Sequence, residues 1–357
     1  YGSFDRNWWH YKIRDFSSII LQQGGYAMLC ASTLPAHSEH ADALTRLASA
    51  SCRFWNTRAK KHGAFEEYYP WEQGYPPVAF STLAVAKMAA TGVVSVQEIS
   101  EGLKIATDQL LNRFEPKATN QQVAGTAAVC WIRKIAPELV DETALRALCD
   151  KTLACQHEEG WYMEYGGPDL GYLTVTMDCL WDAYDAIGDQ RFLESARSAL
   201  NFILPFVQMP QRGAGMFNAR NTDYMVPYGI ARFLNDPKSG DASGVILNRL
   251  FGNCSDPDHF LHAVDDRYFC HYIGHSIFRA LPLLEKGTSI DVCETLNSEM
   301  DLHRNFCSEF GIPLSQLEKT VADSSTNNYC NFLIENATQN SEKFIAVSLL
   351  PCQWGYQ

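Results

Sequence analysis

Helix-period apolar patterns recur along almost the whole chain, and this feature most restricts the folds that it can adopt. Alternating apolar and polar runs, the mark of half-buried strands, are few. Turn sequences separate the patterns, for example KKHG at 60–63, EEG at 158–160 and MPQRGAG at 209–215. The sequence therefore predicts an all-α protein, with helices over residues 15–33, 40–58, 77–91, 96–113, 120–135, 141–155, 170–187, 190–207, 222–234 and 259–284.

A short element repeats ahead of several of these helices. Residues 63–68 (GAFEEY) and 160–165 (GWYMEY) share the pattern G-x-aromatic-x-E-Y, and residues 2–6 and 215–220 are weaker copies. The first glycines stand at 2, 63, 160 and 215, so the gaps are 61, 97 and 55, the middle one close to two periods. A period of about 50 residues accommodates two helices and two turns, so each repeat is predicted to be a helical hairpin.

Five or six such hairpins form either an open superhelix or a closed ring of inner and outer helices. In a closed ring, the loops that lead into the inner helices gather at one mouth. Aromatic faces stack on sugar rings, and carboxylates and Arg bind hydroxyls or acidic sugars, so the loop residues predict a carbohydrate cleft. The alternative is that the aromatic residues only pack one hairpin against the next. The ring would gather Phe65, Glu72 and Tyr162 at this mouth, together with the candidate cleft residues Glu67, Tyr68, Trp71, Trp161, Glu164, Tyr165 and Arg220.

Paired carboxylates in these loops offer acid and base groups for glycoside hydrolysis. The candidate pairs are Glu67 with Glu164 and Asp169 with Asp223. A polysaccharide lyase would instead need a Tyr or His base, for which Tyr68, Tyr165 and His10 are available.

Three phrases carry a resemblance in the first 285 residues. They are DRNWWHYKIRDFSSIILQQGGYAM, FEEYYPWEQGYPPVAFSTLAVAKM and RNTDYMVPYGIARFL. In pattern they resemble the α/α-toroid domain of heparinase II/III-type polysaccharide lyases and related proteins of polysaccharide metabolism. The resemblance implies an α/α-toroid domain over residues 1–288. Those lyases also carry a β-sandwich domain, and no series of alternating strands occurs here.

After residues 281–291 (LPLLEKGTSID) the repeated sequence element no longer occurs. Three further helices are predicted over 293–310, 325–338 and 341–357, and Asp323 and its two following serines offer N-cap oxygens to the second. The last helix contains Cys352 directly after a proline. From the residues alone, Cys352 is either a buried core thiol or a nucleophile at a helix kink.

The phrases SEMDLHRNFCSEFGI, STNNYCNFLIENA and FIAVSLLPCQWGY resemble consecutive helices of the TenA/thiaminase II family. The resemblance implies that residues 289–357 are part of a haem-oxygenase-like helical bundle, a fold that is typically homo-oligomeric. It places the catalytic cysteine at Cys352 and active-site tyrosines at Tyr356 and Tyr329. The implied chemistry is hydrolysis of aminopyrimidines in thiamin salvage, through a covalent adduct on the cysteine that water resolves.

The family also carries an Asp, with a Tyr three residues later, that binds the aminopyrimidine on an earlier helix. Asp265 and Tyr268 have this spacing. The helix at 259–284 therefore either opens the bundle, which would then start at 257, or closes the ring. We favour the ring, because the hairpin count requires it.

Charge and composition narrow the range of partners. The net charge of −12 disfavours nucleic acid and anionic membrane surfaces, and no stretch of 18 apolar residues occurs. Twelve cysteines without a CxxC motif indicate reduced thiols and a cytoplasmic setting. His37 and His40 lack an acidic partner at ligand spacing, and no phosphate-binding glycine motif occurs, so we expect no metal and no cofactor.

Three functions follow as hypotheses. The first is an aminopyrimidine hydrolase fused to a carbohydrate-handling toroid. The second is a polysaccharide-binding or polysaccharide-degrading toroid, with the C-terminal helices as an accessory. The third is a helical scaffold without chemistry. Because the chain begins at Tyr1 and ends at Gln357, inside a helical pattern, we expect a piece of a longer protein that is inactive by itself.

Overall fold

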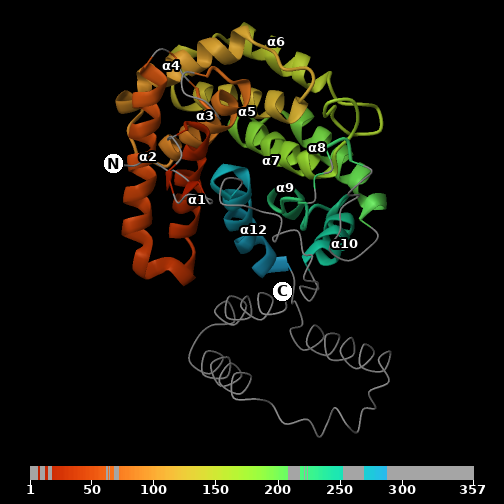
Figure 1. Ribbon diagram of the computed structural model, residues 1–357. Coiled ribbons are helices and arrows are strands. Elements are labelled where there is room, and N and C mark those ends of the chain that lie inside the picture. Colours follow the sequence, from red (N-terminus) through yellow and green to blue (C-terminus); the bar gives the residue numbers. More distant parts are fainter. Residues whose placement is uncertain are drawn as a thin grey trace, which may run out of the picture. The chain divides into compact units, whose positions relative to one another are not determined.

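Helices of an inner layer and helices of an outer layer alternate along the chain in the computed structural model (Figure 1). The chain divides into two compact units, residues 1–254 with 258–289 and residues 255–257 with 290–357. All residues that the structure describes belong to the first unit. They are residues 7–8, 13–14, 18–61, 63, 65–67, 72–207, 218–220, 222, 224–251 and 269–287.

Six helices of the described residues form the inner layer. Helix α3 shows the reason, because almost all of its side chains are buried, as expected for a helix with neighbours on every side. Each inner helix contacts the next, and the last contacts the first, so the series closes on itself. The inner helices are α1 (Gln23–Ser32), α3 (Tyr75–Ala90), α5 (Thr119–Ile135), α7 (Leu170–Ile187), α9 (Tyr228–Ala231) and α12 (Gly274–Gly287).

The amphipathic helices form an outer layer, each packed on the inner helix that precedes it. Successive outer helices also contact one another, so the unit is a ring of helical hairpins in two layers (Figure 1). The outer helices are α2 (Ala41–Lys60), α4 (Val96–Asn112), α6 (Glu142–Leu153), α8 (Gln190–Ile203) and α10 (Gly240–Phe251).

Short elements complete the described part. They are the 3₁₀ turns η1 (Ile20–Gln22), η2 (Pro35–His40), η3 (Pro137–Leu139) and η4 (Leu204–Phe206), the π-helical turn η7 (Phe269–Ile273), and an antiparallel pair of two-residue strands, β1 (Asn7–Trp8) and β2 (Ile13–Arg14). The prediction of an all-α protein is confirmed.

Helix boundaries follow the local sequence closely where caps are present. Helix α7 begins after Asp169, whose carboxylate accepts the backbone N–H of Tyr172, and it ends at Gly188, which adopts a φ of 72°. Helix α4 begins with a capping box between Ser95 and Glu98. These two helices agree with their predicted ranges to within a residue.

The predicted helix 222–234 is largely wrong, since only Tyr228–Ala231 forms an α-helix there. Side chains of α7 take the backbone donors of this segment instead. Thr174 Oγ1 accepts the N–H of Val226 at 2.8 Å, and Pro227 has no N–H to contribute to a helix. Helix α10 was not predicted, because Gly240 and Gly244 weaken its helical pattern.

Helix α12, whose place the sequence left open, packs against α1 and α9 inside the first unit. The predicted helices 293–310, 325–338 and 341–357 lie outside the described residues. Among the described cysteines none is in a disulfide: Cys30, Cys52, Cys130, Cys149, Cys155, Cys179 and Cys270.

Candidate functional site

Three of the loops that lead from an outer helix into the next inner helix are joined by backbone hydrogen bonds. Tyr165 donates its N–H to the carbonyl of Lys117 at 2.7 Å, which joins the loop before α7 to the loop before α5. Ala219 donates its N–H to the carbonyl of Pro168 at 2.9 Å, which joins the loop before α7 to the loop before α9. We call these three segments, residues 113–118, 154–169 and 218–227, the entry loops.

The repeated G-x-aromatic element serves packing. Gly63 and Gly160 have φ values of 60° and 104°, which only glycine adopts readily, and a Cβ on Gly160 would lie 2.3 Å from the carbonyl oxygen of Ser198. The aromatic residues at the third position, Phe65 and Tyr162, are completely or almost completely buried. For these two aromatics, the alternative interpretation as packing anchors is therefore correct.

The last two positions of the second element, Glu164 and Tyr165, lie with Arg220 at the entry loops. The guanidinium carbon of Arg220 lies over the Tyr165 ring, 4.5 Å from its centroid. Tyr165 is 52% exposed and has a φ of 54°, an uncommon conformation for a non-glycine residue. Asp169 holds this arrangement together, because its carboxylate accepts the backbone N–H of Arg220 at 3.1 Å.

Glu164 is a buried carboxyl with one oxygen available. Its Oε1 accepts the backbone N–H of Asn120 at 2.8 Å, while Oε2 has no hydrogen-bond partner in the described part of the chain. Burial raises the pKa of Glu164 to about 8, and the nearby charge of Asp169 raises it too, against the lowering effects of Asn120 and Arg220. At neutral pH this carboxyl is therefore largely protonated, as a general acid must be.

Other predicted cleft residues make local contacts. The Trp161 ring stacks on His157 with centroids 4.3 Å apart, and its Nε1–H donates to Glu159 within the same turn. The backbone N–H of Glu67 donates to Glu72 Oε2 at 3.0 Å in its own loop. Outside the described residues lie Tyr68, Trp71, Asp265, Tyr268, Tyr329, Cys352 and Tyr356, together with His10 and Asp223.

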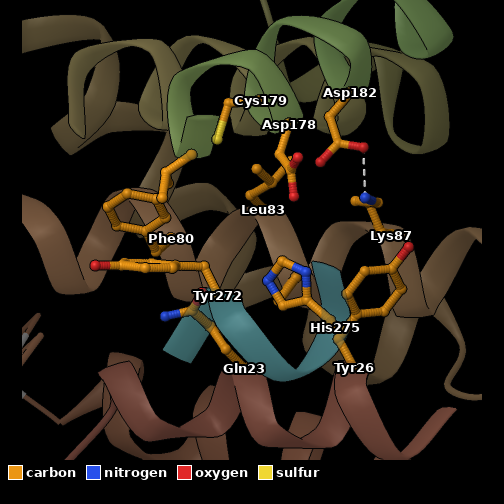
Figure 2. A pocket seen from close by; sticks show the side chains of 12 residues that line it. Gln23, Tyr26, Phe80, Leu83, Lys87, Asp178, Cys179, Asp182, Tyr272 and His275 are labelled. Carbon is orange, nitrogen blue, oxygen red and sulfur yellow. Dashed lines mark hydrogen bonds and ion pairs between the residues drawn. The ribbon is translucent and has the colours of Figure 1, made fainter. Parts of the chain in front are cut away.

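A second polar site occupies the interior of the ring (Figure 2). Lys87 on α3 and Arg279 on α12 both donate to the Oδ1 of Asp182 on α7, each at 2.5 Å. All three side chains are at least nine-tenths buried. Three inner helices are thus joined by one carboxylate shared between two cations.

Electrostatics inside the ring follow from this burial. Burial and the neighbouring charge of Arg279 lower the pKa of Lys87 to about 8, although Asp182 opposes the shift. Burial alone would raise the pKa of Asp182, but Arg279 and Lys87 hold it below its ordinary value. Burial raises the pKa of Asp178, one turn before Asp182, to about 6.

Aromatic rings cover the cations. The guanidinium of Arg279 lies 3.4 Å from the centroid of the Tyr228 ring, and Lys87 Nζ lies 4.6 Å from the centroid of Tyr26. A further pair at the edge of this network joins Arg232 to Asp185 through two hydrogen bonds. The arrangement balances each buried cation with a carboxylate or an aromatic face.

Sequence reasoning missed the interior site, although a signal was present. Lys87 is a single charge in the apolar helix VAFSTLAVAKMAA, and Asp178 and Asp182 stand four residues apart in the apolar run TVTMDCLWDAYDAI. Charges at these positions are expensive to bury unless they are paired. Lone charges on apolar helices are therefore a signal that partners face them from other helices.

A metal site and a membrane-spanning helix are both absent from the part of the chain that the structure describes. No group of three His, Cys, Asp or Glu side chains there is arranged to hold a metal ion. Within the same residues, none of the helices combines the length and the apolar character needed to cross a membrane.

Comparisons with known proteins concern the C-terminal segment. Residues 284–357 match the TENA/THI-4/PQQC family. The toroid resemblance over residues 1–285 finds no support in these comparisons and stays a prediction. No solved structure matches the chain.

One curated relative is the aminopyrimidine aminohydrolase of Halalkalibacterium halodurans. It is 36% identical over 62 residues, which are 17% of this chain and 28% of the relative. The chain thus spans little more than a quarter of that protein's length. Taken together, residues 284–357 form a segment similar to the TENA/THI-4/PQQC family, while the described ring carries its own two polar sites.

Proposed function

We propose that the protein containing this chain hydrolyses an aminopyrimidine through the C-terminal segment. The observation that carries the proposal is the family match over residues 284–357, supported by the similarity to an aminopyrimidine aminohydrolase. Cys352 lies within the matched residues. The fusion of this segment to a carbohydrate-handling ring and the domain limits 1–288 and 289–357 are parts of the proposal.

The reaction uses the cysteine as a nucleophile. The Cys352 thiolate adds to the electron-poor pyrimidine, the amine leaves as ammonia after taking up a proton, and water then releases the cysteine. The products are the hydroxylated pyrimidine and the free thiol. Tyr329 and Tyr356 are proposed to bind the ring or the sulfur, and Asp265 with Tyr268 is the proposed pair for the aminopyrimidine nitrogen atoms.

The first test is the alkylation rate of each cysteine, measured by mass spectrometry with and without an aminopyrimidine. We expect Cys352 to react fast near neutral pH and to be protected by the ligand, while the other eleven cysteines are slow. Slow labelling of Cys352 that is indifferent to the ligand would contradict a formed pocket in this chain.

The second test measures ammonia release from the aminopyrimidine by the full-length protein. Cys352→Ala should abolish release, whereas Cys307→Ala, in the same segment, should leave it unchanged. Activity that survives Cys352→Ala would reject the cysteine mechanism. Cross-linking of the full-length protein tests the proposed homo-oligomer.

A second candidate function is favoured by the entry loops. An exposed aromatic ring and a guanidinium on that ring form a surface suited to an acidic oligosaccharide, with Tyr165 stacking on a sugar and Arg220 binding its carboxylate. Glu164 is the proposed acid. Polysaccharide binding or cleavage at this place is independent of the C-terminal segment.

Glycan binding tests this candidate with a panel of neutral and uronic-acid oligosaccharides. Arg220→Gln should weaken binding of the acidic members at least tenfold, and Tyr165→Ala should weaken both classes. Arg146→Gln is the matched control, because that side chain is 73% exposed on α6, a helix outside the entry loops. Unchanged binding in Arg220→Gln would reject the site.

A further inference from the structure

We propose that the ring binds a phosphate monoester in a hollow between α5, α6, α7 and α8, four helices that pack on one another (Figure 1). The volume of this hollow is about 380 Å³, which is large enough for a small organic ligand. It lies where two inner helices lead into the following outer helices, at the opposite ends of α5 and α7 from the entry loops. We call it the outer hollow. It is independent of both proposed functions, because the family match begins at residue 284.

Charged side chains make up most of the lining of the outer hollow. Cations outnumber carboxylates there by four to two, on a chain whose net charge is −12. The hollow is therefore a positively charged place on an acidic protein, which favours an anionic ligand. The cations are Arg133, Lys134, Arg146 and Arg191, and the carboxylates are Glu142 and Asp189.

Two of the cations converge on one carboxylate. Arg133 Nη2 lies 3.1 Å from Glu142 Oε2, and Arg146 Nη2 lies 4.0 Å from Glu142 Oε1. The space between the two guanidiniums thus already accommodates an oxyanion. Guanidinium groups bind phosphate oxygens through charge-assisted hydrogen bonds, and two of them bind it better than one. The Glu142 side chain is 59% exposed, so it has room to turn into solvent and yield its place to a phosphate.

The charge of the hollow fits a dianion. Within the described residues Lys134 forms no ion pair: its Nζ donates to the carbonyl of Asp185 at 2.8 Å and lies 4.5 Å from the centroid of the Trp131 ring. Arg146 shares Glu142 with Arg133, which is the closer of the two. These contacts leave two positive charges in excess. A phosphate monoester carries close to two negative charges above neutral pH, whereas a carboxylate carries one.

Arg191 plays a different part, because its own carboxylates already satisfy it. Its Nη2 donates to Asp189 at 2.7 Å and its Nη1 donates to Asp150 at 2.6 Å. Helix ends add little to the field, since α5 and α7 end at the hollow and α6 and α8 begin there, and the opposite partial charges of these ends offset one another. The ligand is therefore selected by the side chains of Arg133, Lys134 and Arg146.

Apolar side chains in the same lining favour an ester over inorganic phosphate. Leu145 of α6 is buried, and Ile187 at the end of α7 is 37% exposed. They offer apolar surface to the organic part of the ligand, while the cations bind its phosphate. A small aromatic or aliphatic phosphate monoester is the class of compound that matches both halves of the lining.

Isothermal titration calorimetry of this chain with phenyl phosphate, at pH 8 and low salt, tests the proposal. Lys134→Gln and Arg146→Gln should each weaken binding by about tenfold, because each removes one charged partner of the phosphate. Glu142→Gln should tighten binding by about threefold, because it removes the carboxylate that competes for the two guanidiniums. Absence of binding to the wild type, or weaker binding to Glu142→Gln, would overturn the site.

Arg53→Gln is the matched control. Arg53 pairs with Glu98 at 2.9 Å, its side chain is 56% exposed, and its loss changes the net charge by the same amount as the loss of Lys134 or Arg146. Binding should be unchanged in this variant. Equal weakening in Arg53→Gln and Lys134→Gln would mean that the anion responds only to the overall charge, which would reject the outer hollow as its site.

Two further ligands test the selectivity of the outer hollow. Inorganic phosphate should bind more weakly than phenyl phosphate, since it lacks the apolar part. Glucuronate has a single negative charge and should bind at least about tenfold more weakly than phenyl phosphate, so Arg146 stays a neutral position in the assay with uronic-acid oligosaccharides. Binding of glucuronate as tight as that of phenyl phosphate would contradict a site for a dianion.

Discussion

Lys87 and Asp182 form an ion pair of 2.5 Å between two inner helices, and no more than 5% of either side chain is exposed. Arg279 binds the same carboxylate. Neutralising Asp182 would therefore leave the two buried cations, Lys87 and Arg279, without the charge that they share. Breaking a buried pair in this way costs about 3–5 kcal/mol. We expect Asp182→Asn to lower the free energy of unfolding by about that amount in urea denaturation.

Asp150→Asn is the matched control for this change. Asp150 accepts from Arg191 at 2.6 Å, an equally short pair, but both side chains are more than half exposed. Exposed pairs contribute about 0–1 kcal/mol. Equal losses in the two variants would show that burial does not decide the strength of the Asp182 network.

The loop before α9 packs closely against α7 at Gly171. We therefore expect a side chain at this position to lower the stability of the protein. A Cβ on Gly171 would lie 2.3 Å from Thr222 Cγ2 and 2.4 Å from the carbonyl oxygen of Tyr224, and the backbone oxygen has little room to move. We expect Gly171→Ala to destabilise the protein by about 1–3 kcal/mol. Gly244→Ala, in helix α10 with no atom within 4 Å, should instead stabilise it by about 0.5–1 kcal/mol. The melting temperature of each variant, measured by thermal unfolding, shows whether it is destabilised or stabilised.

The long helices were predictable because their local and global signals agree. Helix α7 has a cap at Asp169, a left-handed glycine at 188 and an apolar pattern between them. The short α9 was not predictable, because backbone N–H groups at its start and just before it donate to side chains on α7. These side chains are about 50 residues away in the chain. Periodicity identifies a buried face but not the atoms that will lie opposite to it.

The two candidate sites also differ in whether a local sequence pattern marks them. Glu164 and Tyr165 were found because a repeated element marks them, and Arg220 because it ends a weaker copy of that element. Asp182, the partner of Lys87, lies 95 positions further along the chain, and Arg279, which shares its carboxylate, lies 97 positions beyond Asp182, so no local pattern joined them. The ring closure that brings α12 beside α1 had to be seen in three dimensions.

The capping box of α4 makes a local prediction that is independent of both sites. The Ser95 side chain accepts the N–H of Glu98, and Glu98 accepts the N–H of Ser95 in return. Ser95→Ala removes the first bond and should cost about 1 kcal/mol in urea denaturation. Ser100→Ala, inside the same helix, should leave stability unchanged or raise it slightly, because alanine is the better helix former. A loss at residue 100 as large as that at residue 95 would contradict a specific capping role.

Protonation of Glu164 predicts a particular dependence of stability on pH. Its pKa is raised from the ordinary value of 4.5 to about 8, chiefly by burial. Between these two values the folded protein holds a proton that the unfolded chain has released, so this group stabilises the fold less and less as the pH rises. Glu164→Gln keeps the neutral form at every pH. We expect the variant to match the wild type at pH 5 and to be more stable at pH 9, by up to about 4 kcal/mol.

Urea denaturation at pH 5, 7 and 9 separates this effect from the other titrating groups. Asp178 and Lys87 titrate in both proteins and cancel in the difference between variant and wild type. Glu159→Gln is the control, because Glu159 lies in the same loop with a side chain that is 64% exposed, and its stability should follow the wild type throughout. Parallel pH curves for Glu164→Gln and wild type would mean that Glu164 is ionised in the folded protein. Its proposed role as an acid at the entry loops would then lose its physical basis, because an ionised carboxylate has no proton to donate.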